Sequence, residues 1–441
     1  MLKQIVFIIS LLITLGVFAY TVLRLVSFFK LTKKGFPVKN FGKRFSVMMS
    51  VAIGQTKIFR RPVLGLLHAL VFWGFCVILI GSVEMVIDGI AGTERVLSSL
   101  GIVYDVVFAT GDIFALIIAI AILVFLFRRI FMHVKRFAGI EMTHKNHVDA
   151  NFALTLIFLL MVTLLGMNTF YIQHAIAAGH EVEGVYPVSN LFAGMFAGMS
   201  EHSLFILHEM NWWAHILLIF FFANYLPYSK HFHVFMSVPN VFLSRLEPLG
   251  KLDNMENITR EVKLMMDPNA AFAQPAPGEE QPIERFGVKD IEDIIWKNYF
   301  DSLACTQCGR CTSVCPANIT GKKLSPRKII MDVRARMNEK APKLVKDSNF
   351  DDNKSLIRDY ISEEELWACT TCNACAQECP ININHPTLIV AMRRYLVMEE
   401  AASPGELNTI FNNIENNGAP WQFSQQDRML WAEELYINEK A

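Results

Sequence analysis

The sequence predicts an all-α protein, in which a bundle of five transmembrane helices is followed by a helical soluble domain. The 441-residue chain is mostly apolar up to residue 230 and becomes charged and proline-containing from residue 240. The first part contains five apolar segments that each reach the roughly 20 residues needed to cross a bilayer. The second part contains two similar cysteine runs, joined by segments with helix signals.

The expected spans share length and apolar character. They lie near residues 5–29, 64–87, 104–127, 151–171 and 205–225. The first is longer than the apolar region of a signal peptide and is not followed by a small-residue cleavage site, so a permanent anchor is expected.

Lysine and arginine are distributed unevenly between the loops. They gather in the loops at 30–61 and 128–145, whereas the loop at 88–103 holds Arg95 alone and the loop at 174–207 holds none. Basic loops stay on the cytoplasmic side. We therefore expect a multi-pass protein of the cell's inner (cytoplasmic) membrane, with its N-terminus outside and its cysteine domain in the cytoplasm.

The cysteine runs at 305–316 and 369–380 both read C-x2-C-x2-C-x3-C-P. This is the ligand pattern of [4Fe–4S] ferredoxins, in which the fourth cysteine of one run binds the other cluster. Zinc sites usually pair two ligands with two distant ones, and disulfides require an oxidising compartment, so both fit less well. The ninth cysteine, Cys76, is expected in the apolar core. One predicted cluster is bound by Cys305, Cys308, Cys311 and Cys379, and the other by Cys369, Cys372, Cys375 and Cys315.

Three histidines lie within or beside the spans, where ionisable residues are functional candidates. His68 lies near the cytoplasmic end of the second span, His215 lies within the fifth, and His233 follows it. His215 and His233 are five helical turns apart, so a continuous helix would place them on one face about 27 Å apart. Such a face suits b-type haems, because neutral imidazoles bind haem iron axially.

Residues 227–239 and the preceding His215 resemble the last span of the cytochrome b subunit of respiratory nitrate reductase. They are more similar still to membrane subunits of heterodisulfide-reductase-like complexes and of electron-transfer-flavoprotein:menaquinone oxidoreductases. Residues 61–75 match the second span of that group. The resemblance implies that His68 and His233 bind one haem b and that His215 binds a second. The nitrate reductase pattern has a further histidine where this chain has Ile78, so either one haem or two is expected.

Four further histidines are expected to have other roles. His174 is the nearest guess for a missing ligand of the second haem. His202 and His208, with Glu201, are expected at the membrane interface or in quinone chemistry, which exchanges protons. His385, after the second cysteine run, is expected at the surface.

The predicted domains are a nitrate reductase gamma-like transmembrane cytochrome b domain (1–236), a linker (237–287), a helical two-cluster ferredoxin domain (288–400) and a tail (401–441). A helix is expected at 325–337, and Ser362 is expected to open another in a capping box. The long segment between the cysteine runs resembles the α-helical ferredoxins of heterodisulfide reductase and of succinate and glycerol-3-phosphate dehydrogenases. The tail's aromatics suggest docking to a partner: they are Trp421, Phe423, Trp431 and Tyr436.

The expected function is membrane-bound electron transfer between a cytoplasmic redox partner and quinone, expected to be menaquinone. The formal net charge is +0, so nothing suggests that the protein binds nucleic acid.

No dinucleotide fingerprint or phosphate-binding loop is found, and the Cys-Cys-Gly domain of fused relatives is missing. The substrate-side catalytic unit is therefore expected on another subunit, either a Cys-Cys-Gly protein or a flavoprotein such as an electron-transferring flavoprotein. Quinone reduction is favoured; a quinol-oxidising subunit that feeds a disulfide-type reductase, or a redox sensor or anchor, is the alternative.

Overall fold

The computed structural model describes residues 1–267, 285–422 and 424–433. The proline-rich part of the expected linker and the tail residues Phe423 and Tyr436 lie outside these ranges. The chain forms two compact units: residues 1–252 with 290–386, and residues 253–289 with 387–441. The predicted domain boundaries stay a prediction.

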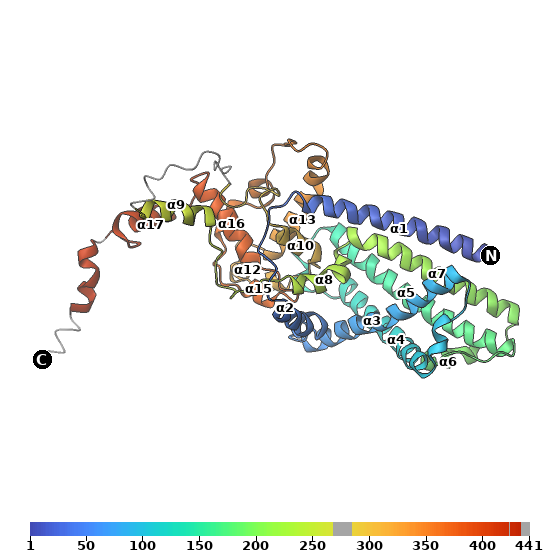
Figure 1. Cartoon of the computed structure of the whole chain (residues 1–441). Coiled ribbons are helices and arrows are strands. Elements are labelled where there is room, and N and C mark those ends of the chain that lie inside the picture. The colour runs from blue at the N-terminus through green and yellow to red at the C-terminus, as the bar shows by residue number, and fades with distance from the viewer. Residues whose placement is uncertain (268–284, 423, 434–441) are drawn as a thin grey trace. The chain divides into compact units, whose positions relative to one another are not determined.

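The first unit is built on five long helices, labelled in Figure 1. Helix α1 packs against α3 and α7, α3 packs against α4, α4 against α5, and α5 against α7, so the five close a ring. All five are long and apolar enough to cross a membrane, which confirms the five predicted spans. Their bounds are α1 Leu2–Phe29, α3 Pro62–Ala91, α4 Ile102–Ile130, α5 His144–Ala177 and α7 Glu201–Tyr225.

The helix ends follow local sequence. Pro62 starts α3, where its missing N–H costs nothing and its ring presets a helical φ. Gly92 ends the same helix at φ +73°, a left-handed conformation that glycine adopts without strain. Ser200 caps α7 by accepting a hydrogen bond from the backbone N–H of Ser203.

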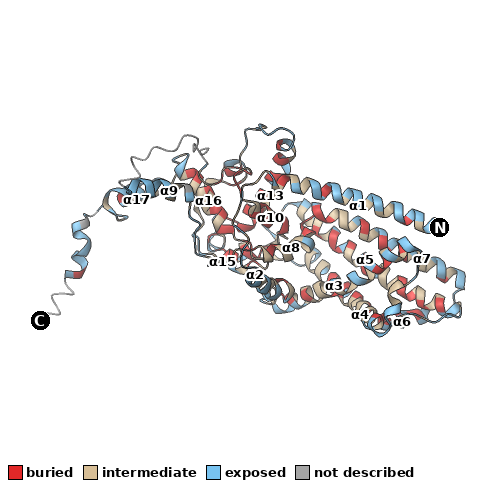
Figure 2. Cartoon of the chain, viewed as in Figure 1, coloured by how far each residue is buried: buried red, intermediate tan, exposed pale blue. Residues whose placement is uncertain are grey.

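The outward faces of these helices are apolar and exposed, as Figure 2 shows in pale blue along α1. Leu12 and Ile13 each expose 63% of their surface. A continuous apolar exterior on hydrogen-bonded helices is suited to lipid, and the chain is accordingly a membrane protein. Cys76 also lies exposed on α3, so its expected burial in the core is wrong; lipid accepts a small thiol as readily as a core does.

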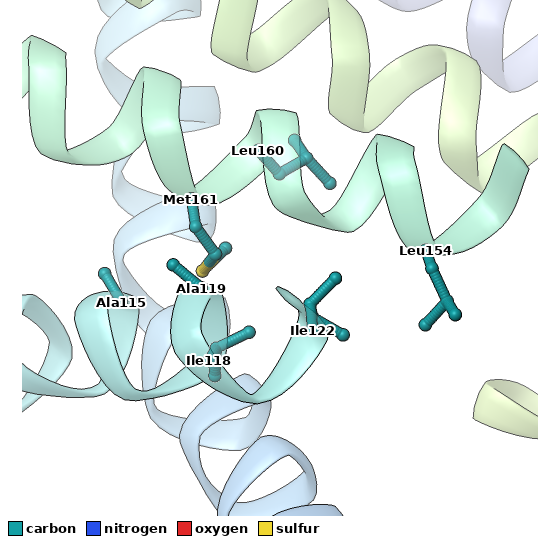
Figure 3. Packing of buried hydrophobic residues seen from close by; sticks show 7 residues of the cluster. All are labelled: Ala115, Ile118, Ala119, Ile122, Leu154, Leu160 and Met161. Carbon is teal, nitrogen blue, oxygen red and sulfur yellow. The ribbon is translucent and has the colours of Figure 1, made fainter. Parts of the chain in front are cut away.

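The interior is held together by close contacts between helices. Figure 3 shows one cluster in which Ala115 and Ala119 of α4 lie near Met161 of α5. Small residues at such positions let helix backbones approach closely. Gly74 does the same between α3 and α4, since a Cβ there would lie 2.7 Å from the ring of Phe114.

Shorter elements connect the long helices. Helix α2 (Phe41–Met48) continues into the π-helical turn η1, and α8 follows two 3-10 turns after α7. Their bounds are η1 Met49–Ile53, η2 Val96–Leu100, η3 Lys135–Phe137, α6 Pro187–Ala193, η4 Gly194–Phe196, η5 Leu226–Tyr228, η6 Lys230–Phe232 and α8 His233–Phe242.

The cysteine-containing part of the first unit is helical as well. Ser325 caps the long helix α13 through the backbone N–H of Lys328, and Ser362 with Glu365 forms the predicted capping box. No strand occurs in the described residues, and the predicted all-α class is confirmed. The elements here are α10 Trp296–Ala304, α11 Arg310–Ser313, α12 Pro316–Ile319, α13 Pro326–Leu344, η8 Leu356–Tyr360, α14 Glu363–Trp367 and α15 Ala374–Glu378.

The second unit contains α9 (Glu256–Met266), most of α16 (His385–Met398), α17 (Gly405–Asn417) and η9 (Gln425–Met429). Within it, the backbone N–H of Val288 donates to the carbonyl of Ala391 over 3.0 Å. The tail aromatics Trp421 and Trp431 expose 58% and 72% of their surface.

Candidate functional site

The two cysteine runs adopt the same unusual backbone. In the first run, Gln307 and Gly309 have φ of +58° and +73°; at the matching places of the second, Thr371 and Asn373 have +55° and +62°. Left-handed residues on both sides of the second cysteine bend the chain sharply. The third cysteine of each run then lies on a short helix, α11 or α15. Each run therefore curls its first three thiols toward one side.

The fourth cysteine of each run lies with the other run. Burial raises the pKa of Cys379 to about 12, and the neighbouring charges of Cys308 and Cys305 act in the same direction. The pKa of Cys375 is likewise raised to about 12 by burial and by the charges of Cys369 and, from the other run, Cys315. Cys379 thus lies near Cys305 and Cys308, and Cys315 lies near Cys375. That each crossed set binds one cluster stays a prediction.

The donor sets fit [4Fe–4S] clusters better than single metal ions. Among the described residues, no three His, Cys, Asp or Glu side chains converge on a point where one metal ion could bind. A cluster takes its four thiolates at separate corners, so it needs them gathered but not touching. Backbone N–H groups also face the sulfurs, from Thr371 to Cys369 and from Ile383 to Cys379, each over 3.4 Å. Such N–H···S contacts tune cluster potential.

Basic loops between the spans contact the cysteine runs directly. Lys57, in the loop before α3, donates from Nζ to the carbonyl oxygen of Cys379 over 3.2 Å. In the opposite direction, the guanidinium of Arg310, the residue before Cys311, donates to the backbone carbonyl of Lys57 over 2.9 Å. The loop before α3 is thus bonded to both runs.

A second basic loop, between α4 and α5, is held by Arg327. This side chain is only 1% exposed. Its guanidinium donates to the carbonyls of Arg136 and Ala138 at 2.6 and 2.8 Å and pairs with the carboxylate of Glu141. Both loops that carry the positive charge lie on the side of the bundle where the cysteine runs lie.

His68 lies two turns into α3, close to that end of the bundle. Its Nδ1 lies 3.2 Å from Oε1 of Gln55. The amide nitrogen of Gln55 donates to the carbonyl of Ala52, so Oε1 is free to accept the Nδ1 proton. The lone pair of His68 is thereby placed on Nε2, the form in which an imidazole binds haem iron.

His233 begins α8 and lies near His68. Burial, together with the charges of His231 and His68, lowers the pKa of His233 to about 3. Its Nδ1 is buried and has no hydrogen-bond partner within the described chain. A buried imidazole kept neutral, with a second one beside it, fits a pair of axial haem ligands, as predicted for these two residues.

His215 lies apart from this pair, in the middle of α7, and is buried. Its Nδ1 lies 3.0 Å from the hydroxyl of Thr163, which itself donates to the carbonyl of Leu159. His215 lines a cavity of about 160 Å³, and so does Ile78. His174 does not line this cavity, and its ring instead lies 5.5 Å from that of Phe205. Among the described residues, the other histidine that lines this cavity is His208, which comes from the same helix.

Sequence reasoning missed two features of these sites. Gln55 belongs to no motif. Its contact with His68 depends on a π-helical turn and on a φ of +54°, which no local sequence pattern predicts. The expected exposure of His385 is wrong: it is 1% exposed, because α16 starts directly behind the turn that carries Cys379.

The fold and these sites define a membrane-associated iron–sulfur electron-transfer protein. A family model described as a 4Fe-4S dicluster domain matches residues 304–383, which contain both cysteine runs. The prediction of a dicluster domain is thereby confirmed.

Three relatives support the same class. The chain is 29% identical to the probable iron-sulfur-binding oxidoreductase FadF of Bacillus subtilis, over 95% of this chain and 59% of that protein. It is 28% identical to the EtfAB:quinone oxidoreductase of Syntrophomonas wolfei, over 88% of this chain and 54% of that protein. A component of the dihydromethanophenazine:CoB–CoM heterodisulfide reductase of Methanosarcina mazei is 29% identical over 31% of this chain and 34% of its own length.

The predicted resemblance to such oxidoreductase subunits is confirmed. The chain spans a little over half the length of the first two relatives. No solved structure matches the chain.

Proposed function

We propose that this protein carries electrons between a soluble redox partner and membrane quinone, through two [4Fe–4S] clusters and one haem b. The observation that carries the proposal is a bonded path from the cysteine runs to the ligand candidate His68. Lys57 binds the backbone of Cys379, and the same short loop contains Gln55, which holds His68. Electron carriers must lie close together, and this loop ties the two sites to one another.

Bound clusters and haem supply one-electron carriers, whose chemistry is their own. The chain's residues bind and orient them. The crossed thiols of Cys315 and Cys379 would make each cluster depend on both runs. Gln55 holds the ring of His68, and burial keeps His233 neutral and able to bind iron.

The favoured direction is quinone reduction, with an electron-transferring flavoprotein as the donor. The printed name of the Syntrophomonas relative, an EtfAB:quinone oxidoreductase aligned over 88% of this chain, supports it. The second candidate is the reverse flow, from quinol to a disulfide-type reductase. It is favoured by the heterodisulfide reductase relative, whose alignment covers only 31% of the chain.

The proposed sidedness follows the basic loops. The loops held by Arg310 and Arg327 are the two that the distribution of lysine and arginine predicts to be cytoplasmic. We infer that the dicluster domain faces the cytoplasm of the cell and that the N-terminus lies outside. A cytoplasmic position keeps the cysteines reduced, as cluster ligands require.

The test is to purify the full-length protein in lipid nanodiscs and to quantify haem and iron. We expect about eight cluster irons and one haem iron per chain. Adding reduced electron-transferring flavoprotein, and then a naphthoquinone, should first reduce and then reoxidise the haem absorbance. A preparation with full iron content and no b-type haem would contradict the proposal. Haem that is reduced by quinol but never by the flavoprotein would favour the second candidate.

A further inference from the structure

The cavity beside His215 lies toward the end of the bundle that is remote from the cysteine runs. It is lined by residues from the late part of α3, the early part of α4 and the first half of α7, including Glu84, Gly111 and His208. His68, by contrast, lies at the opposite end of α3, where that helix meets the cysteine runs. The cavity is therefore a second site, separate from the pair formed by His68 and His233.

The size and the histidines of this cavity do not suit a haem. The cavity measures about 160 Å³, which is room for a small aromatic ring system and not for the macrocycle of a haem. Its two histidines, His208 and His215, both come from α7, two turns and about 10 Å apart. Axial haem ligands must approach the iron from opposite faces, and α3 offers only Ile78 here.

His208 presents a hydrogen-bond acceptor that no described residue uses. Its Nδ1 lies 3.1 Å from the carbonyl oxygen of Met167. A carbonyl only accepts, so Nδ1 carries the proton and Nε2 carries the lone pair. No other hydrogen bond of His208 is formed within the described residues, which leaves Nε2 available to a ligand in the cavity it lines.

Four carboxylates line the cavity, those of Glu84, Asp88, Glu94 and Asp112. Glu94 is exposed, and of the three others Glu84 has the least occupied oxygen. Asp112 is occupied by the backbone N–H groups of Val188 and Ser189, and Asp88 by those of Arg95 and Val96. These two acids hold the loops between helices.

Glu84 is only 4% exposed. Its Oε1 accepts a hydrogen bond from the backbone N–H of Leu97 over 3.0 Å, whereas Oε2 has only a contact of 3.5 Å with the hydroxyl of Tyr104. The buried Oε2 can therefore accept a hydrogen bond from a ligand.

We propose that this cavity binds the ring of the membrane quinol, whose two hydroxyls donate hydrogen bonds to Nε2 of His208 and to Oε2 of Glu84. The quinone form binds there when these two groups carry the protons that its ring oxygens accept. Apolar side chains of α5 and α7, among them Leu164, Met167 and Trp212, supply the walls that such a ring needs. The inference deepens the proposed function, because it names the site at which the quinone of that function is held.

The chemistry of the step requires proton-exchanging groups at such a site. Reduction adds two electrons and two protons to a quinone, and each ring C=O becomes C–OH. The reduced flavoprotein of the proposed function loses the two electrons, which arrive singly through the relay. His208 and Glu84 take protons from water and pass them to the two ring oxygens; in the reverse reaction they take them back.

Two glycines offer a matched test of the cavity. Gly111 lines it, and a Cβ added there meets no atom within 4 Å, so Gly111→Leu fills the space without a fixed clash. Gly16, in α1, also has nothing within 4 Å but does not line the cavity, so Gly16→Leu is the control. The probe is a fluorescent hydroxyquinoline N-oxide, a quinone analogue, titrated against the full-length protein in nanodiscs while haem per chain is measured.

We expect Gly111→Leu to abolish binding of the probe and to leave haem per chain unchanged, while Gly16→Leu alters neither. Equal binding by the two variants would overturn the inference, and so would a loss of haem in Gly111→Leu, since the cavity would then hold the haem.

His208→Leu should weaken binding of the probe about tenfold, the usual effect of one lost hydrogen bond. His180→Leu, at an exposed residue that does not line the cavity, should leave it unchanged, and equal affinities of these two variants would also overturn the inference.

These outcomes separate the inference from the proposed function. A haem-free protein whose probe binding depends on Gly111 and His208 would reject the relay and support the site. A protein with one haem, whose probe binding is indifferent to both residues, would reject only the site.

Discussion

The Nδ1 atom of His68 donates to Oε1 of Gln55 over 3.2 Å, and this bond links a transmembrane helix to the loop that contacts the cysteine runs. The loop residue Lys57 binds the carbonyl of Cys379 only two positions further along. The same few residues therefore orient a candidate haem ligand and hold the dicluster domain in place. This proximity is the structural basis of the proposed electron path.

Replacing Gln55 tests that bond. Gln55→Leu removes the acceptor for the Nδ1 proton of His68, and outer-shell partners of this kind typically change ligand affinity about 10–100-fold. We expect a corresponding loss of haem affinity, measured by competition with a haem-binding apoprotein. Gln55→Glu keeps an acceptor and should retain haem, with a lower midpoint potential because a carboxylate makes the imidazole more basic. The exposed Gln426→Leu is the control, and haem affinity in Gln55→Leu equal to that of the control would contradict the role assigned to Gln55.

Removal of either member of the histidine pair should remove the haem. We expect His68→Ala and His233→Ala each to lose the b-type absorbance, since one axial ligand is insufficient to hold haem firmly in a buried site. Iron in the clusters should stay near eight atoms per chain, because neither residue is among the predicted cluster ligands. His202→Ala, on an exposed residue, should behave as the unaltered protein. Unchanged absorbance in both pair variants would disprove this ligand assignment.

The crossed arrangement of the cysteines predicts which cluster each run affects. Cys379→Ser should damage the cluster held mainly by the first run, and Cys315→Ser the cluster held mainly by the second. In each case cluster iron should fall from about eight atoms toward four, and the two variants should lose different signals in electron paramagnetic resonance. Cys76→Ser, on an exposed thiol of α3, should change neither. If Cys379→Ser and Cys372→Ser lost the same signal, the crossing would be refuted.

Arg327 is expected to matter for stability and for coupling. Its ion pair with Glu141 is nearly fully buried, with side chains 1% and 3% exposed. Removing one partner of a buried pair typically costs about 3–5 kcal/mol, because the other charge is left unpaired. Arg327→Ala should therefore lower the thermal unfolding temperature markedly and slow haem reduction by the soluble partner. Lys323→Ala, which removes the exposed pair with Glu364, should do neither; equal unfolding temperatures for the two variants would show that the Arg327 pair does not hold the domain.

Much of this architecture could be predicted from the sequence alone. Lipid demands long, internally hydrogen-bonded apolar helices, so five spans could be counted from hydropathy. Cysteine spacing determined the dicluster domain in the same direct way, because the ligands of a cluster lie close together in the chain. The capping box of Ser362 could also be predicted, because its partner Glu365 lies only three residues away in the chain.

Only the tertiary structure decided how these parts meet. The tautomers of His68 and His208 depend on partners 13 and 41 residues away, Gln55 and Met167. The burial of His385 and the cavity beside His215 depend on how helices pack. Periodicity and spacing report on neighbours along the chain, whereas burial and hydrogen bonding depend on neighbours in space. The sequence by itself therefore determined the class of this protein and predicted its cluster ligands, and the fold decided which histidines lie near one another and where a cavity opens between the helices.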